Sequence, residues 1–138
     1  MSPQPPSPWQ PALPKPVSLA EKFALFSEPW QPKRIGRIDG YDVRIARLQG
    51  EFVWHSHADA DEFFFVVEGV LRMHFRAGSE HWREDVRPGA LIIVPKGVEH
   101  KPEALTPETK IMLVEKSETV NTGDGPANAR TVADPEYI

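Results

Sequence analysis

The sequence predicts an all-β domain built as a sandwich or barrel. Several short segments combine apolar and β-branched residues, and some alternate apolar with polar positions. Glycine and proline turns separate these segments every 8–12 residues, a spacing typical of sandwiches and barrels. A chain of 138 residues corresponds to one domain with its own hydrophobic core.

Composition excludes several classes of function. Sixteen basic residues against 20 acidic ones give a net charge of −4, whereas a surface for nucleic acid normally carries a basic excess. No apolar run approaches the roughly 18 residues of a membrane span. The first residues lack the pattern of a secretory signal, so we expect a cytoplasmic protein. Without cysteine, any metal must be held by His, Asp, Glu or backbone oxygen.

The first 40 residues are predicted to lie outside the barrel. Residues 1–17 form a Pro-rich arm, with seven prolines between positions 2 and 16 that disfavour regular hydrogen-bonded structure. The arm is either a flexible tail or a segment that packs through Trp9 and Leu13. Ser18 and Glu21 fit a capping box and predict a short helix through Phe26. Irregular chain is then expected up to residue 40.

The barrel is predicted over residues 41–116. Alternation predicts a strand at 41–47, and the chain is expected to stay extended over 51–57. Further strands are expected at 62–67, 70–75, 81–86, 90–94 and 110–115. Residues 117–138 are polar and contain glycine and proline, so they are predicted to form a C-terminal extension on the surface.

Two segments carry the residues suited to a metal. His55 and His57 are two residues apart, so in an extended chain both side chains point to the same face. A short loop then leads to Glu62 at the start of the next strand, and the turn Pro95-Lys96-Gly97 precedes His100. Three imidazoles and one carboxylate suit a divalent transition metal such as Fe, Mn, Ni or Zn. The alternative is that these four residues satisfy one another without metal, which would leave costly buried polar groups.

The same residues resemble the two motifs of the cupin superfamily. The first motif is matched by Gly50, His55-Ser56-His57, Glu62 and Gly69, and the second by Gly89, Pro95-Lys96-Gly97 and His100. The resemblance covers about residues 41–115 and implies a double-stranded β-helix, or jelly-roll barrel, with one metal per subunit. It also implies that His55, His57, Glu62 and His100 are the metal ligands.

This chain departs from the family pattern at two positions. Four residues separate Gly50 from His55 where the pattern has five, so the turn before the first motif is expected to differ. Ala104 stands where the second motif ends in Asn, which removes a supporting hydrogen bond and no ligand.

The chain also resembles a set of small single-domain bacterial cupins, most of which have no assigned reaction. The shared features are the opening Leu19-Ala20-Glu21-Lys22-Phe23, the core Trp54-His55-Ser56-His57 and the stretch Asn121-Thr122-Gly123-Asp124. The last stretch could be a lid over the barrel mouth or an ordinary turn.

Other polar residues near the motifs are expected to be bystanders. Asp59 and Asp61 are read as solvated loop acids, although they could contact a metal or substrate. His74 and His81 lie outside both motifs and are read as surface histidines.

Apolar residues of the predicted strands have two possible roles. Five of these residues belong either to the core or to the lining of a substrate pocket: Phe64, Val66, Met73, Phe75 and Met112. Phe64 could do both. An apolar pocket would favour a small aromatic or hydrophobic ligand. Trp54, Phe63 and Phe65 are expected to form an outward apolar patch, which predicts a homodimer.

The favoured function is a small metalloenzyme that acts on an oxygen-bearing small molecule. The resemblance allows isomerase, dioxygenase or lyase chemistry, because the fold hosts the site without dictating the reaction. Glu62 is expected either to remain a ligand or to act as a catalytic base. The alternative is a non-catalytic cupin that binds or senses a small molecule.

Overall fold

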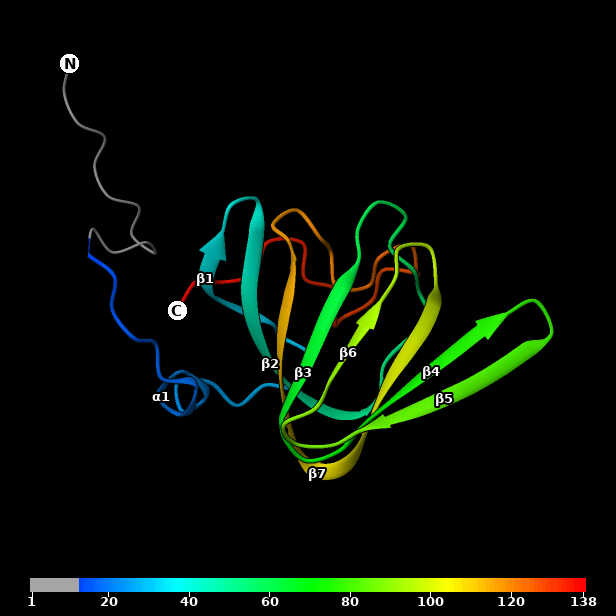
Figure 1. Cartoon of the computed structure of the whole chain (residues 1–138), viewed down its shortest axis with the longest axis horizontal. Coiled ribbons are helices and arrows are strands. Elements are labelled where there is room, and N and C mark those ends of the chain that lie inside the picture. Colours follow the sequence, from blue (N-terminus) through cyan, green and yellow to red (C-terminus); the bar gives the residue numbers. More distant parts are fainter. Residues whose placement is uncertain (1–12) are drawn as a thin grey trace, which may run out of the picture.

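The computed structural model describes residues 13–138, so most of the predicted Pro-rich arm, including Trp9, lies outside the described residues. Leu13, which could have anchored that arm, is 71% exposed. Antiparallel strands and one short helix make up the described chain (Figure 1), which confirms the all-β class. The elements are α1 (Leu19–Phe23), β1 (Lys33–Ile38), β2 (Tyr41–Glu51), β3 (Glu62–Glu68), β4 (Leu71–Ala77), β5 (Glu80–Val86), β6 (Leu91–Val94) and β7 (Glu99–Lys116).

The long strand β7 joins the two halves of the barrel. Its first part, Glu99–Ala104, pairs with β4, which in turn pairs with β5 in a hairpin that projects to one side. Its second part pairs with β2 on one edge and β3 on the other, giving the order β1-β2-β7-β3-β6. The expected strand at 110–115 is therefore only the second part of β7. The first part was not predicted from the sequence because it contains Pro102 and is close to Pro107, and proline normally argues against a strand interior.

Helix α1 begins as predicted and ends earlier. The Ser18 side chain accepts a hydrogen bond from the Glu21 backbone N–H at 3.2 Å. The helix ends at Phe23, not Phe26. The Arg47 guanidinium donates to the carbonyl oxygens of Phe23 and Phe26 at 2.8 and 2.9 Å, so these carbonyls are satisfied without a further helical turn.

The expectation of irregular chain up to residue 40 is wrong for residues 33–38, which form β1. This strand pairs antiparallel with β2, from Lys33 opposite Ile45 to Ile38 opposite Tyr41. Asp39 and Gly40 make the turn between them, with Asp39 at a φ of 53°. An Asp-Gly pair between two strands is a strong hairpin signal.

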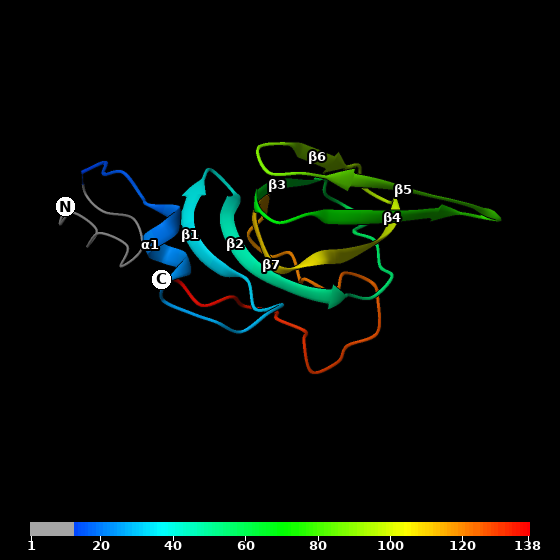
Figure 2. The ribbon, with the colours of Figure 1, turned by 90° about the horizontal axis from the view of Figure 1, so that it is seen from below.

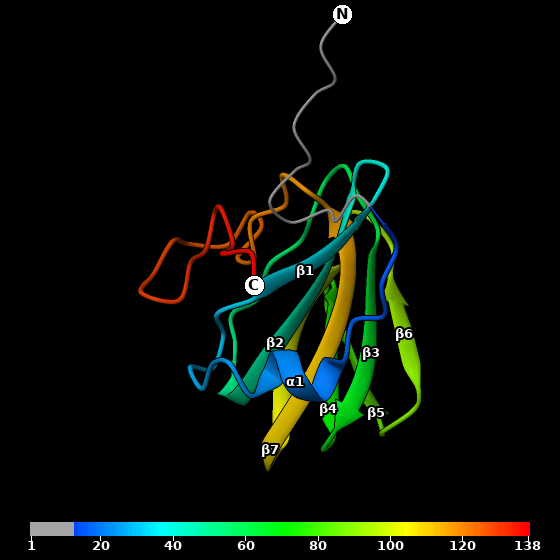
Figure 3. The same cartoon turned by 90° about the vertical axis from the view of Figure 1, so that its left-hand side faces the viewer.

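Strand β2 is buried on both faces. Asp42, Arg44, Ala46 and Leu48 alternate towards the barrel interior, whereas Ile45 faces the opposite side. Helix α1 lies across that outer face (Figure 3), where Phe23 packs with Ile35 and Ile45. Arg44 and Ile45 are both fully buried.

Candidate metal centre

The two motif segments lie directly opposite each other. The His55 N–H donates to the His100 carbonyl at 3.0 Å, and the His100 N–H donates to the His55 carbonyl at 2.8 Å. A third bond, from the Gly97 N–H to the His57 carbonyl at 2.8 Å, holds the Pro-x-Gly turn against the first motif. These backbone bonds place the rings of His55 and His100 with their centroids 4.3 Å apart.

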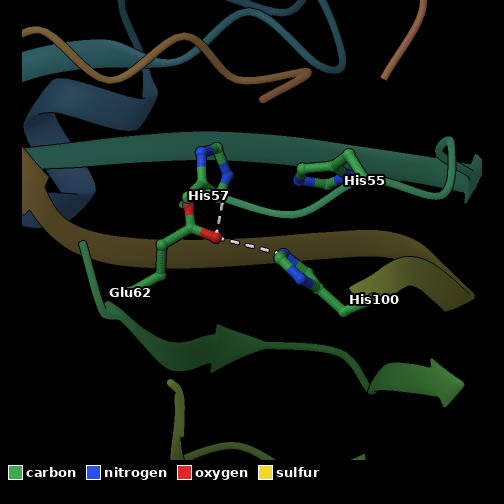
Figure 4. Close-up of side chains that lie close together, drawn as sticks. All are labelled: His55, His57, Glu62 and His100. Atoms are coloured by element: carbon green, nitrogen blue, oxygen red, sulfur yellow. Dashed lines mark ion pairs between the residues drawn. The ribbon is translucent and has the colours of Figure 1, made fainter. Parts of the chain in front are cut away.

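The four predicted ligands form one buried cluster. His55, His57, Glu62 and His100 each offer a ligand atom, and all of these atoms lie within 4.8 Å of one another. Each residue is less than 10% exposed. Figure 4 shows Glu62 between His57 and His100, with its Oε1 at 3.0 Å from the Nε2 atom of each ring. Such a cluster could hold a metal ion.

The short contacts in the cluster are not ordinary hydrogen bonds. His57 Nε2, His100 Nε2 and Glu62 Oε1 are buried and lack a partner with hydrogen-bond geometry. Two ligands at about 2.1 Å from a metal and at right angles to each other are about 3.0 Å apart. The observed separations therefore fit adjacent ligands of one divalent ion, and the orphaned atoms fit the same explanation.

Backbone carbonyls orient two of the rings. The Nδ1 atoms of His55 and His100 lie 2.9 Å from the carbonyl oxygens of Val53 and Val98. A neutral imidazole that donates from Nδ1 carries its lone pair on Nε2. Both rings therefore turn a ligand atom towards the centre, as imidazole ligands of metal sites commonly do.

The electrostatics of the cluster favour the protonation states that a metal requires. Burial, followed by the nearby His100, lowers the pKa of His55 to about 4, so this ring is neutral at pH 7. Burial alone would raise the pKa of Glu62. Contacts with His100 and His57 outweigh burial and hold the pKa of Glu62 well below its usual range.

A mainly apolar pocket adjoins the cluster. Its volume is about 50 Å³, and one buried water needs about 10–15 Å³. Phe64 lines the pocket, while Val66, Met73 and Phe75 belong to the core, and Met112 packs on the outer face of the sheet. The lining residues are Trp30, Pro32, Ala46, Leu48, Phe52, His55, Glu62, Phe64, Pro102, Ile111, Leu113, Glu115 and Asn121.

Sequence reasoning missed Glu115 and Arg44. Glu115 is 1% exposed, and its Oε1 accepts a hydrogen bond from Arg44 Nη1 at 3.0 Å. Burial, followed by the adjacent Glu62 carboxylate, raises the pKa of Glu115 well above its ordinary value. The alternation of side chains along β7 could have indicated that Glu115 is buried, because it lies on the same face of the strand as Ile111 and Leu113.

The C-terminal extension packs against the cluster. Asp124 accepts hydrogen bonds from the Ser56 backbone N–H at 2.6 Å and from the Ser56 hydroxyl at 2.8 Å. A Cβ on Gly123 would lie 3.0 Å from His57 and 3.1 Å from His55. Figure 2 shows the extension, in orange and red, looping outside the strands beside β2 and β7. The Asn121–Asp124 stretch is therefore a turn that also covers two of the histidines.

The other candidates lie outside the cluster, and residues 13–138 contain no second cluster of this kind. Asp61 accepts a hydrogen bond from the Lys96 backbone N–H at 2.9 Å and so joins two loops. His74 lies on the outer face of β4, 2.8 Å from Glu103, and His81 is exposed. The Arg76 guanidinium lies 4.3 Å from the Trp54 ring, so Trp54 is partly covered.

A barrel with a buried cluster of three histidines and one carboxylate defines a protein with an interior site suited to a divalent metal. The chain belongs to the cupin domain family, whose model matches residues 43–115. No helix within residues 13–138 is long and apolar enough to cross a membrane.

Solved structures confirm the cupin fold. A cupin-2 domain protein from Shewanella frigidimarina is 41% identical, with a TM-score of 0.67 over 72% of this chain and 93% of that one. Protein NMB1881 from Neisseria meningitidis is 30% identical, with a TM-score of 0.65 over 75% of this chain and 100% of that one. The uncharacterized protein YdbB from Bacillus subtilis is 32% identical over 60% of this chain and 65% of its own length.

Proposed function

We propose that the protein is a metal-dependent cupin enzyme that acts on a small, mainly apolar molecule with a metal-binding oxygen. One divalent transition metal, such as Fe, Mn, Ni or Zn, binds through His55, His57, Glu62 and His100. The observation that carries the proposal is the convergence of four buried ligand atoms within 4.8 Å. Isomerase, dioxygenase and lyase chemistry all remain within this class.

The residues of the chain have distinct parts in this function. The bound metal supplies a Lewis acid that polarises an oxygen of the substrate. The three imidazoles and Glu62 would hold the ion, and the apolar side chains of Trp30, Phe52 and Phe64 exclude water from the adjoining pocket. A role of Glu62 as a catalytic base stays a prediction.

Metal content of untagged protein, purified without added metal and measured by mass spectrometry, tests the proposal. We expect close to one equivalent of one transition metal per chain, and His57→Ala should lose at least nine-tenths of it. His81→Ala is the matched control, because His81 is exposed and lies outside the cluster. Less than a tenth of an equivalent of every metal, with no thermal stabilisation by added ions, would refute the metal site.

The assembly is proposed separately, as a homodimer. Leu91 and Ile93 on the edge strand β6 are 52% and 55% exposed, and they pair with Phe65 and Phe63 on β3. An exposed apolar face of this kind favours association of two copies. Light scattering on the eluting protein should give a dimer mass that Ile93→Lys reduces to that of one chain. A wild type of one-chain mass would contradict the dimer.

A further inference from the structure

Trp30 lines the apolar pocket with a backbone conformation that is rare for its residue type. Its φ is 62°, in the left-handed region that bulky side chains seldom adopt because Cβ comes too close to the following carbonyl oxygen. The residue is nevertheless buried, with only 4% of its surface exposed. Strained residues of this kind persist where the surrounding structure fixes them, and they cluster at ligand sites.

Four contacts fix the indole at the pocket. The Trp30 N–H donates to the Arg47 carbonyl, and the indole Nε1 donates to the Gln49 carbonyl, both at 2.8 Å. The ring stacks on Phe52, with centroids 4.6 Å apart and planes 17° apart. The Arg130 guanidinium lies 5.6 Å from the ring centroid. Strand β2, the chain after it and the C-terminal extension therefore all hold the indole in place.

The pocket extends from the metal cluster to this indole. The Phe52 ring is nearly perpendicular to the His55 ring, with centroids 5.7 Å apart, and both residues line the pocket together with Glu62 and Trp30. The volume of about 50 Å³ is room for about three to five water molecules. A metal-bound ligand therefore has space for a body of only a few carbon atoms.

Hydrogen bonding leaves little means of choosing among such bodies. Outside the four ligands, the lining has two polar side chains besides the indole, Asn121 and Glu115. The Asn121 amide donates to the Arg130 carbonyl and accepts from a backbone N–H of the C-terminal extension. Glu115 is bonded to Arg44 at 3.0 Å and also to Glu62. The shape of the pocket is what remains to discriminate between ligands.

We propose that Trp30 is a specificity-determining residue that limits the metal-bound ligand to a small apolar body. This inference rests on the proposed metal site and narrows its substrate class to a metal-binding oxygen group attached to a few carbon atoms. A larger body, such as a phenyl ring, would collide with an indole that its contacts prevent from moving aside. Trp30 lies before residues 43–115, the part that matches the cupin domain, so the limit comes from the segment that precedes the barrel.

Two hydroxamates test the size limit, because they present the same metal-binding oxygens and differ only in the body. Acetohydroxamate carries a methyl group, and benzohydroxamate carries a phenyl ring. Calorimetry on the full chain loaded with Ni²⁺ gives the dissociation constant of each probe, after the Ni²⁺ affinity of each variant has been measured alone. We expect wild type to bind acetohydroxamate about tenfold or more tightly than benzohydroxamate.

Three variants show whether Trp30 causes this preference. Trp30→Gly removes the indole together with the backbone strain, since glycine adopts a φ of 62° freely, and it should reduce the preference about tenfold or more. Trp30→Phe keeps a ring that can stack on Phe52 and should reduce the preference about threefold or more. Trp82→Phe is the matched control, because Trp82 is 42% exposed on β5 and does not line the pocket. It should leave the preference unchanged.

The outcomes separate this inference from the proposed function. Failure of Ni²⁺ to bind wild type refutes the metal site itself. Normal Ni²⁺ binding by a wild type that prefers benzohydroxamate, or that binds neither probe, overturns the size limit. A preference that Trp30→Phe leaves unchanged, or that Trp82→Phe reduces as much, also overturns the role of Trp30. Trp30→Phe alone decides the matter if Trp30→Gly does not fold.

Discussion

Gly123 lies against His57 so closely that a single added carbon would meet the ring at 3.0 Å and the Ser56 carbonyl oxygen at 2.4 Å. The glycine belongs to the C-terminal extension, whereas His57 belongs to the first cupin motif. Its φ of 51° also falls in the left-handed region that favours glycine. The turn after the barrel and the metal cluster are thus packed as one unit.

Gly123→Ala should therefore disturb the metal site as well as the fold. We expect a loss of about 2–4 kcal/mol in the free energy of unfolding from overpacking and backbone strain. Displacement of His57 should also weaken Ni²⁺ binding about 10- to 100-fold. Denaturant unfolding and calorimetry measure the two effects.

Gly78→Ala is the matched control for this change. Gly78 has a φ of 59°, but nothing lies within 4 Å of its added Cβ. Gly78→Ala should lower the free energy of unfolding by only about 1 kcal/mol, the strain of the left-handed conformation. Its Ni²⁺ affinity should be unchanged. Equal Ni²⁺ affinities in the two variants would contradict the coupling of the turn to the cluster.

Asp124→Ala should loosen the extension without adding bulk. The two hydrogen bonds from Ser56 to this carboxylate also lower the pKa of Asp124. Their loss should raise hydrogen exchange of residues 119–125 and of the Ser56 amide at least tenfold. Asp134→Ala, in an exposed part of the same extension, should leave these amides as they are. If these amides exchange in Asp124→Ala at the wild-type rate, other contacts hold the segment.

Metal-free protein should lose stability as the pH falls from about 6.5 towards 4. The pKa of His55 is about 4 in the fold against an ordinary value of 6.5, so the unfolded chain binds more protons in this interval. The contribution of His55 is complete above pH 6.5 and is lost as the pH falls through the folded pKa. A difference of about 2.5 in pKa corresponds to at most about 3 kcal/mol.

Comparison with His55→Asn isolates this effect, since Glu115, with its raised pKa, contributes a slope of opposite sign over part of the same range. His57, Glu62 and His100 face the same point and are present in both proteins. Urea unfolding of chelator-treated samples at pH 5 and pH 8 should show a smaller pH dependence in His55→Asn. His81→Asn should show the pH dependence of wild type. The same pH dependence of the unfolding free energy in all three proteins would refute the contribution of His55.

Arg44→Met should be severely destabilising. It removes the guanidinium that lies between the buried carboxyl groups of Asp42 and Glu115. Breaking a buried ion pair at one partner costs about 3–5 kcal/mol. Arg72→Met breaks the partly exposed pair with Asp85 and should cost less than about 1 kcal/mol. Similar midpoints of urea unfolding for the two variants would contradict this view of the Arg44 network.

The sequence predicted the metal cluster because its geometry is local. Two histidines two residues apart must share a face of an extended chain, and the Pro-x-Gly turn directs His100 towards them. Most strand segments were visible for the same reason, since alternation and turn residues act over a few positions, but β1 and the first part of β7 were missed. All four members of the buried cluster could therefore be named before any tertiary structure was known.

The network around Glu115 could not be predicted in the same way. A charged residue near the end of a strand normally faces water, and only the register that sets Arg44 opposite Leu113 brings the guanidinium within reach of Glu115. That register depends on pairing across about 70 residues of sequence. Burial of both faces of β2 likewise depends on α1 covering the outer one, which alternation within β2 cannot reveal.

The pocket draws its walls from different parts of the chain. All four proposed metal ligands and Glu115 fall within residues 43–115, the part that matches the cupin domain. Trp30 and Pro32 come from before this range and Asn121 from after it. The proposed metal ligands and part of the pocket wall therefore come from different segments of the chain. We expect that exchanging the two flanking segments between related barrels would change ligand preference and leave the four proposed metal ligands in place.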